Sequence, residues 1–149
     1  MDHPAGPHDA DPQPERLLQI GEVADEVGLS HRTVRYYDNE GLLTASARSA
    51  GNYRLYTRRD VERMRVIMAM KPLGFSLEEM GRLLTALDAV RGDQPVGAPA
   101  APGAEGAQDT GTTLAHFAAE SVRRRAKLAA RLAMADDLIT ELQRHTPGA

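Results

Sequence analysis

The stretch HRTVRYYDNEGLL, His31–Leu43, places two arginines and two tyrosines within six residues and ends on a glycine and two leucines. Ser30, just before it, is a residue type that favours the N-cap of a helix, and Gly41 is typical of the position where a helix ends. The sequence therefore predicts a short helix from His31 to about Glu40.

A second helical pattern lies immediately before this one. Gly28 follows it at a C-cap position, and its apolar stripe at i, i+3, i+4 and i+7 consists of Ile20, Val23, Ala24 and Val27. Two short helices joined by a tight turn that holds a glycine are typical of the helix-turn-helix.

The outer face of the second helix is polar. If Val34 is buried and each residue advances by about 100°, the opposite face carries Arg32, Arg35, Tyr36 and Asn39, while Tyr37 falls at the edge near Val34. Arginine can pair bidentately with guanine in the major groove, and tyrosine and asparagine can bind phosphates or base acceptors. The face suits DNA recognition; the alternative is a solvated face in which Arg35 pairs with Asn39 or Asp38.

The next stretch, TASARSAGNYRLYTRRD over Thr44–Asp60, predicts a small β-hairpin, or wing. Gly51-Asn52 is a hairpin signal. Tyr53, Leu55 and Thr57 alternate with Arg54 and Tyr56, so we expect the first three on a half-buried side and Arg54 exposed on the other.

Two capping-box spacings then predict two further helices. Thr57 with Asp60 begins one that ends near Lys71-Pro72, and Ser76 with Glu79 begins another, with an apolar face of Leu77, Met80, Leu83, Leu84 and Leu87. We interpret the methionines at 64, 68, 70 and 80 as core residues.

Composition limits the possible functions. The formal charge is −3, from 18 basic and 21 acidic side chains, but residues 31–71 hold nine basic against four acidic, a local surplus of five. The absence of cysteine excludes disulfides and thiolate metal sites. We find no nucleophile–base pair, phosphate loop or paired carboxylates, and no apolar run or leader typical of a membrane or secreted protein. We therefore expect a cytoplasmic protein that is not an enzyme and has no cofactor.

The chain divides into four parts. We expect a disordered Pro- and Asp-rich tail over 1–16, a DNA-binding domain with a self-contained core over 17–90, a flexible Gly/Ala/Pro linker over 91–111, and one long helix over 112–146. The long linker could be an inert insertion or a hinge. His116 and Glu120 stand at i, i+4 on the helix, but two ligands without a third do not make a zinc site.

The long helix carries a stripe with spacings of three and four, which Ser121 and Arg125 interrupt in its first half. The stripe predicts a dimerisation seam of Leu114, Ala118, Leu128, Leu132, Ala135, Ile139 and Leu142. The alternative is that the helix packs back on its own domain.

Together, IGEVADEVGLSHRTVRYYDNEGLL, RSAGNYRLYTRRDVERM and MKPLGFSLEEMGRLL resemble the DNA-binding domain of the MerR family of bacterial transcription regulators. The resemblance implies a mainly α, winged helix-turn-helix fold, with the helix over 31–40 in the major groove and the wing on the flanking DNA backbone. It also implies a homodimer held by an antiparallel coiled coil. Such a dimer binds a pseudo-palindrome in an overlong promoter spacer and distorts double-stranded DNA to realign the elements for RNA polymerase.

The resemblance also implies which residues bind DNA. Arg35, Tyr36 and Tyr37 match the family's recognition helix, and Gly51, Tyr53 and Arg54 match its wing, where the inserted Asn52 is a departure. The expected DNA-binding residues are His31, Arg32, Thr33, Arg35, Tyr36, Tyr37, Arg48, Asn52, Tyr53 and Arg54.

Other functions stay open at this point. A DNA-architectural, excisionase-like protein would bend DNA away from promoters, and an adaptor using only the coiled coil would not bind DNA. Metal-sensing members of the family use cysteines, which this chain lacks, and we expect no separate effector domain. The protein is then either effector-independent or binds a small ligand where the long helix meets the DNA-binding domain.

Overall fold

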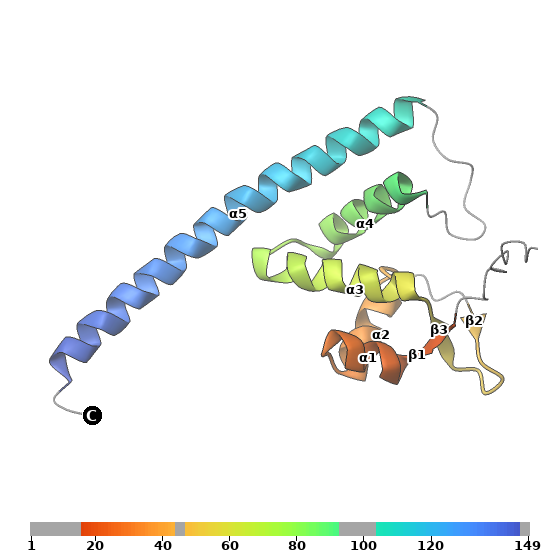
Figure 1. Cartoon of the computed structure of the whole chain (residues 1–149), viewed down its shortest axis with the longest axis horizontal. Coiled ribbons are helices and arrows are strands. Elements are labelled where there is room, and N and C mark those ends of the chain that lie inside the picture. The colour runs from red at the N-terminus through yellow and green to blue at the C-terminus, as the bar shows by residue number, and fades with distance from the viewer. Residues whose placement is uncertain (1–15, 44–46, 93–103, 147–149) are drawn as a thin grey trace, which may run out of the picture.

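The computed structural model describes residues 16–43, 47–92 and 104–146 (Figure 1). Residues 1–15 of the expected tail over 1–16 and residues 93–103 of the expected linker lie outside the described residues. In chain order the elements are β1 (Leu18–Gln19), α1 (Ile20–Val27), α2 (His31–Asn39), β2 (Ala47–Arg48), β3 (Arg54–Tyr56), α3 (Arg58–Met70), the 3₁₀ helix η1 (Lys71–Leu73), α4 (Leu77–Arg91) and α5 (Ala104–His145).

The helix-turn-helix over α1 and α2 is confirmed. Gly28 ends α1 in the left-handed region at φ 69°, where glycine has no steric penalty. The hydroxyl of Ser30 accepts a hydrogen bond from the backbone N–H of Thr33 at 3.1 Å and so caps α2.

A three-stranded antiparallel sheet in the order β1-β3-β2 forms the base of the wing. Leu18 lies opposite Tyr56, and Arg48 lies opposite Arg54. The sequence did not predict β1, because a two-residue strand is too short to show an alternating pattern.

The expected faces of the wing strand are confirmed for Leu55 and Thr57, which are half-buried, and for Arg54, which is exposed. They are wrong for Tyr53 and Tyr56. Tyr56 is buried, Leu55 is half-buried, and Tyr53 is 74% exposed. The physical reason is that α1 and α3 pack on β3 and enclose Tyr56, whereas Tyr53 lies beyond β3 toward the hairpin loop.

The wing turns through a three-residue loop, Ala50–Asn52. The backbone N–H of Asn52 donates to the carbonyl of Ser49 at 2.9 Å, and Asn52 takes a left-handed φ of 65°. Asparagine is one of the few residues other than glycine that tolerates this conformation, which accounts for its presence between Gly51 and Tyr53.

The two predicted capping boxes are present. The N–H of Thr57 donates to Asp60 Oδ2 at 2.9 Å at the start of α3, and the N–H of Ser76 donates to Glu79 Oε2 at 2.8 Å at the start of α4. Met64, Met70 and Met80 are buried and Met68 packs against the same core, as predicted.

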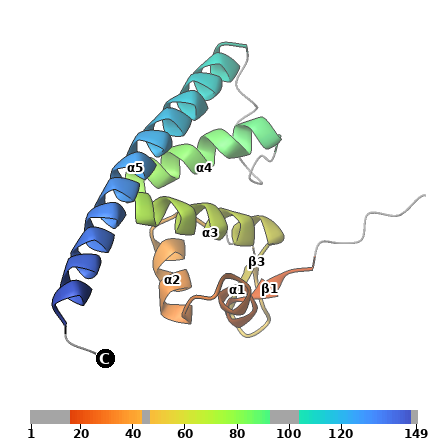
Figure 2. The ribbon, with the colours of Figure 1, turned by 60° about the vertical axis from the view of Figure 1, so that its left-hand side comes forward.

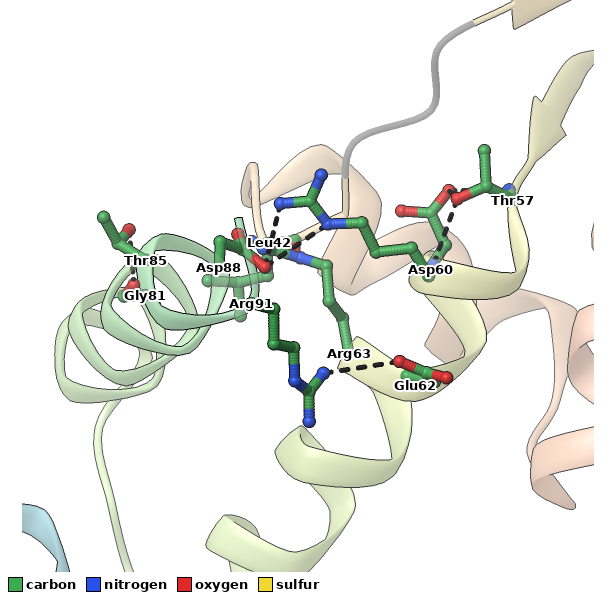
Figure 3. A network of polar contacts seen from close by, with 10 residues as sticks. Leu42, Thr57, Asp60, Glu62, Arg63, Gly81, Thr85, Asp88 and Arg91 are labelled. Atoms are coloured by element: carbon green, nitrogen blue, oxygen red, sulfur yellow. Dashed lines mark hydrogen bonds and ion pairs between the residues drawn. The ribbon is translucent and has the colours of Figure 1, made fainter. Parts of the chain in front are cut away.

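A polar network joins α3 to α4 and to Leu42, three residues beyond the end of α2 (Figure 3). Arg63 is buried, and its Nε donates to the carbonyl of Leu42 at 2.7 Å. Arg63 also pairs with Asp88 on α4, which Arg59 contacts at 2.9 Å. The network fixes the end of the helix-turn-helix against the helices behind it.

The helix α5 begins at Ala104, so eight residues of the predicted linker belong to α5, and Arg91 belongs to α4. Its first half lies beside α4, and its second half extends away from the other elements (Figures 1 and 2). Phe117 is 3% exposed and packs at 5.7 Å, between ring centroids, on Phe75. The expectation that residues 17–90 close their own core is therefore wrong, because α5 supplies one of its side chains.

Candidate nucleic-acid interface

The outer face of α2 is exposed as predicted. His31, Arg32, Arg35 and Tyr36 are exposed, Thr33 is half-buried, and Val34 is buried on the other side. Among residues 16–43, 47–92 and 104–146, the structure gives neither Arg32 nor Arg35 a hydrogen-bond or ion-pair partner. The alternative in which Arg35 pairs with Asp38 is not observed, because Asp38 pairs with Arg54. The guanidinium groups of this face are thus available to a partner.

Tyr37 does not belong to this face. Its side chain is buried in the core, because Tyr37 lies three residues after Val34 and therefore on the same side of the helix. Its ring stands edge-on to Tyr36, with centroids 5.2 Å apart and planes at 66°. The assignment of Tyr37 to DNA contact is corrected: it supports Tyr36 from behind.

The wing presents Arg48, Asn52 and Tyr53 at the surface. Arg48 Nη1 donates to the backbone oxygen of Asn52 at 3.3 Å and lies 3.4 Å from its side-chain oxygen. A Cβ at Gly51 would lie 3.0 Å from the Tyr53 ring, so the glycine leaves room for that ring. The side chains at the wing tip are held by contacts with one another.

An open groove of about 280 Å³ lies between α2 and the wing. Of the predicted site residues it brings together Arg35, Asn52, Tyr53 and Arg54; the remaining lining residues are Gln19, Ile20, Asn39 and Tyr56. The other predicted site residues lie outside the groove lining: His31, Arg32, Thr33, Tyr36, Tyr37 and Arg48. The ring of His31 instead lies near Gly21 of α1. The helix face and the wing therefore border a single concave surface with two guanidinium groups.

Sequence reasoning missed one residue of this region, Asp38. Its carboxylate accepts a hydrogen bond from the hydroxyl of Tyr56 at 2.7 Å and pairs with Arg54 Nη1 at 2.5 Å. The hydrogen bond to Asp38 raises the pKa of Arg54. Burial, together with the same carboxylate, raises the pKa of Tyr56, so its phenol stays protonated and remains a donor at neutral pH. The sequence feature that could have identified Asp38 is an acidic residue on the buried side of an amphipathic helix.

The distal half of α5 offers a second exposed surface of different chemistry. Leu128, Leu132, Ile139 and Leu142 are 43% to 64% exposed, and Ala135 is exposed between them. In the first half, Leu114 is half-buried and Ala118 is exposed. The residue of this half that packs on the domain is Phe117, and the place of Leu114 and Ala118 in a dimer seam stays a prediction.

The described residues contain no group of three or more His, Cys, Asp or Glu side chains that could hold a metal ion. The carboxylate of Glu120 accepts hydrogen bonds from Arg123 and Arg124, so its pairing with His116 as a zinc ligand is not supported. None of the described helices is long and apolar enough to cross a bilayer.

The part of the chain that holds the helix-turn-helix and the wing is similar to known proteins. A family model described as "MerR HTH family regulatory protein" matches residues 18–87. The mercuric resistance operon regulatory protein of Bacillus cereus is 40% identical over 71 residues, which cover 48% of this chain and 54% of that protein. The uncharacterized HTH-type transcriptional regulator PA4778 of Pseudomonas aeruginosa is 43% identical over 68 residues, which cover 46% and 52%. The matches thus span about half of each curated relative.

A solved structure resembles the larger part of the chain. This structure is HiNmlR, which is described as a MerR family regulator that lacks the sensor domain and is bound to promoter DNA. It aligns with this chain with a TM-score of 0.63 at 22% sequence identity. The alignment covers 86% of this chain and 85% of that chain. At this identity the likeness concerns the fold, including the long C-terminal helix.

Proposed function

We propose that this chain, whose residues 18–87 match the family model of MerR regulators, is a transcriptional regulator that binds a pseudo-palindromic promoter operator as a homodimer. It distorts the bound DNA to activate or repress transcription by RNA polymerase. The observation that carries the proposal is the cationic face of α2, which borders the same groove as the wing.

The two parts of this surface take different roles. The exposed face of α2 enters the major groove, where Arg35 and Arg32 can pair with guanine edges. The wing meets the flanking phosphates through Arg48 and Arg54, because a hairpin beside the recognition helix reaches the backbone rather than base edges. Sequence preference therefore depends mainly on α2.

The exposed stripe on distal α5 supports the homodimer. Stable soluble proteins rarely leave a long row of leucine and isoleucine in water, and a second copy of the same helix offers a matching stripe. An antiparallel pair of such helices places two DNA-binding domains on two half-sites. HiNmlR, described as bound to promoter DNA without a sensor domain, supports promoter binding by a chain of this shape.

Signal detection through cysteine is not part of this proposal, because the sequence contains no cysteine. The described residues also hold no cluster that could bind a metal ion. We therefore infer that regulation through this chain does not involve thiolate metal sensing.

Selection from a random-sequence duplex library with the wild-type chain, followed by mapping of bound sites in a genome, tests the function. We expect one enriched pseudo-palindrome located between promoter elements. Sites enriched away from promoters would favour a DNA-architectural, excisionase-like protein instead, and no enriched sequence would reject specific binding.

The role of α2 is tested by Arg35→Ala on the selected duplex and on a scrambled duplex of equal composition. We expect a loss of roughly tenfold or more on the selected duplex and a smaller loss on the scrambled one, since a bidentate base contact is worth about 1–3 kcal/mol. Arg144→Ala is the matched control, because it removes an exposed arginine at the far end of α5. Equal losses on both duplexes for Arg35→Ala would contradict base reading by α2.

A further inference from the structure

The buried carboxylate of Asp38 is the feature of α2 that the proposed function does not explain. Its side chain is 3% exposed, and Tyr56 and Arg54 both approach the same oxygen, Oδ2. Burying a carboxylate is costly unless it is paired and hydrogen-bonded. Its two partners offset that cost, and both come from the strand β3 of the wing.

Asp38 also provides the polar link between α2 and the wing. The helix α2 packs on α1, whereas β3 pairs with β1 and β2. Within the described residues, the hydrogen bond and the ion pair that join α2 to residues 47–57 both end on Asp38. The separation of the recognition helix from the wing therefore depends on this carboxylate.

Arg54 can contact Asp38 and a DNA phosphate at once. Its side chain is 40% exposed and lines the groove together with Arg35. A guanidinium has five N–H donors in a rigid plane, and the contact to Asp38 is made through Nη1. The remaining donors are available to a phosphate oxygen at the mouth of the groove.

We propose that Asp38 is a positioning residue for DNA recognition, which orients the Arg54 guanidinium so that α2 and the wing meet one stretch of duplex at a fixed separation. The inference rests on the proposed function, since it assigns no new ligand. Holding a binding group in its bound orientation raises affinity by lowering the ordering cost of association.

The direction in which one substitution changes DNA affinity distinguishes a positioning role from a purely electrostatic one. Asp38→Asn keeps the size of the side chain and an oxygen that can accept the hydrogen bond from the Tyr56 hydroxyl. It removes a negative charge close to the DNA. If the only effect of the Asp38 charge is to reduce the attraction between Arg54 and the DNA phosphates, the variant binds all DNA more tightly. If Asp38 positions Arg54, the variant loses affinity for the specific site despite its added positive charge.

We expect Asp38→Asn to bind the selected duplex roughly tenfold more weakly and the scrambled duplex as well as or better than the wild type does. Fluorescence anisotropy at three salt concentrations measures both affinities. Tighter binding to both duplexes, or equal loss on both, overturns the proposal.

Two further variants separate positioning from general destabilisation. Tyr56→Phe removes the hydroxyl bond to the same oxygen and leaves the Asp38–Arg54 pair, so we expect a lower melting temperature with affinity for the selected duplex within about twofold of wild type. In an Arg54→Ala background, Asp38→Asn should cause no further loss of affinity, because the group that Asp38 orients is gone. The double variant also has no unpaired buried charge, which favours its folding.

Either of two results overturns the positioning role: Tyr56→Phe weakens DNA binding as much as Asp38→Asn does, or the losses from Arg54→Ala and Asp38→Asn add. If the wild-type chain enriches no sequence in the selection, the proposed function itself is rejected. A wild-type chain that selects a duplex while the variants behave otherwise than expected rejects only the role of Asp38.

Discussion

The two halves of α5 have apolar residues on the same side of the helix but have different surroundings. Phe117 in the first half is buried against Phe75. Leu128 and Ala135 follow it by eleven and eighteen residues, about three and five turns, and so lie on the same side of the helix. Both are exposed. The same helical face is therefore covered by the DNA-binding domain near α4 and left uncovered beyond it.

This difference indicates that α5 has two roles. Its first half closes the core of the domain, so its position is coupled to α4. Its second half leaves apolar area that the described part of the chain does not cover, and we propose that a second copy covers it. A disturbance of the first half should thus change the stability of the monomer, and a disturbance of the second half should change association.

The largest effect is expected for Phe117→Ala. Truncation of a buried phenylalanine typically costs about 3–5 kcal/mol, through lost burial and the cavity left behind. We expect a destabilised domain in chemical denaturation, with an intact second half of α5. Val122→Ala is the control, because Val122 is an apolar residue on the exposed side of the same half. Equal stability of the two variants would show that α5 does not complete the core.

Leu132→Glu disturbs the second half. A charge in each of two facing helices should dissociate the dimer, and loss of the tether between two half-sites should weaken operator binding by roughly 10²-fold. Sedimentation and operator titration measure the two effects. Met134→Glu is the matched control, since Met134 is exposed and apolar but lies about 200° around the helix from Leu132. A Leu132→Glu chain that stays dimeric with unchanged affinity contradicts the proposed seam.

Arg124→Ala refines the boundary between the halves. Its guanidinium lies 4.1 Å from the Phe75 ring centroid, donates to the Leu73 carbonyl at 3.4 Å and pairs with Glu79 at 3.3 Å. The side chain is partly exposed, so we expect a modest loss of stability, measured by denaturation. Arg123→Ala, which removes a more exposed arginine paired to Glu120, should have a smaller effect.

The smallest effect is a pH dependence at the same junction. Hydrogen bonds from Arg124 and Arg123 lower the pKa of Glu120 from 4.5 to about 2, and the backbone N–H of Ser76 is the main cause of the lowered pKa of Glu79. A lowered folded-state pKa gives stability that is present above pH 4.5 and is lost as the pH falls toward 2. We expect Glu120→Gln to be less stable than wild type at pH 6 and to approach it near pH 2. A stability difference that does not change with pH would contradict this coupling.

Several elements could be predicted from sequence because local rules are sufficient to define them. Ser30, Gly28 and the two capping boxes begin or end their helices through contacts within four residues. The outer face of α2 follows from helical periodicity. Tyr37 was assigned to the wrong surface because a match to a family motif does not distinguish a side chain that contacts DNA from one that packs behind it.

The sequence by itself thus determined the helix-turn-helix, the existence of the wing and the presence of a long C-terminal helix, since short-range spacing and capping specify them. Only the tertiary structure decided that Tyr56 rather than Tyr53 is buried, that Asp38 joins α2 to the wing, and that Phe117 completes the core. Each of these depends on a contact between residues 18 or more positions apart. Such contacts arise from how the elements pack together, and a local pattern contains no information about which distant side chain will be the partner.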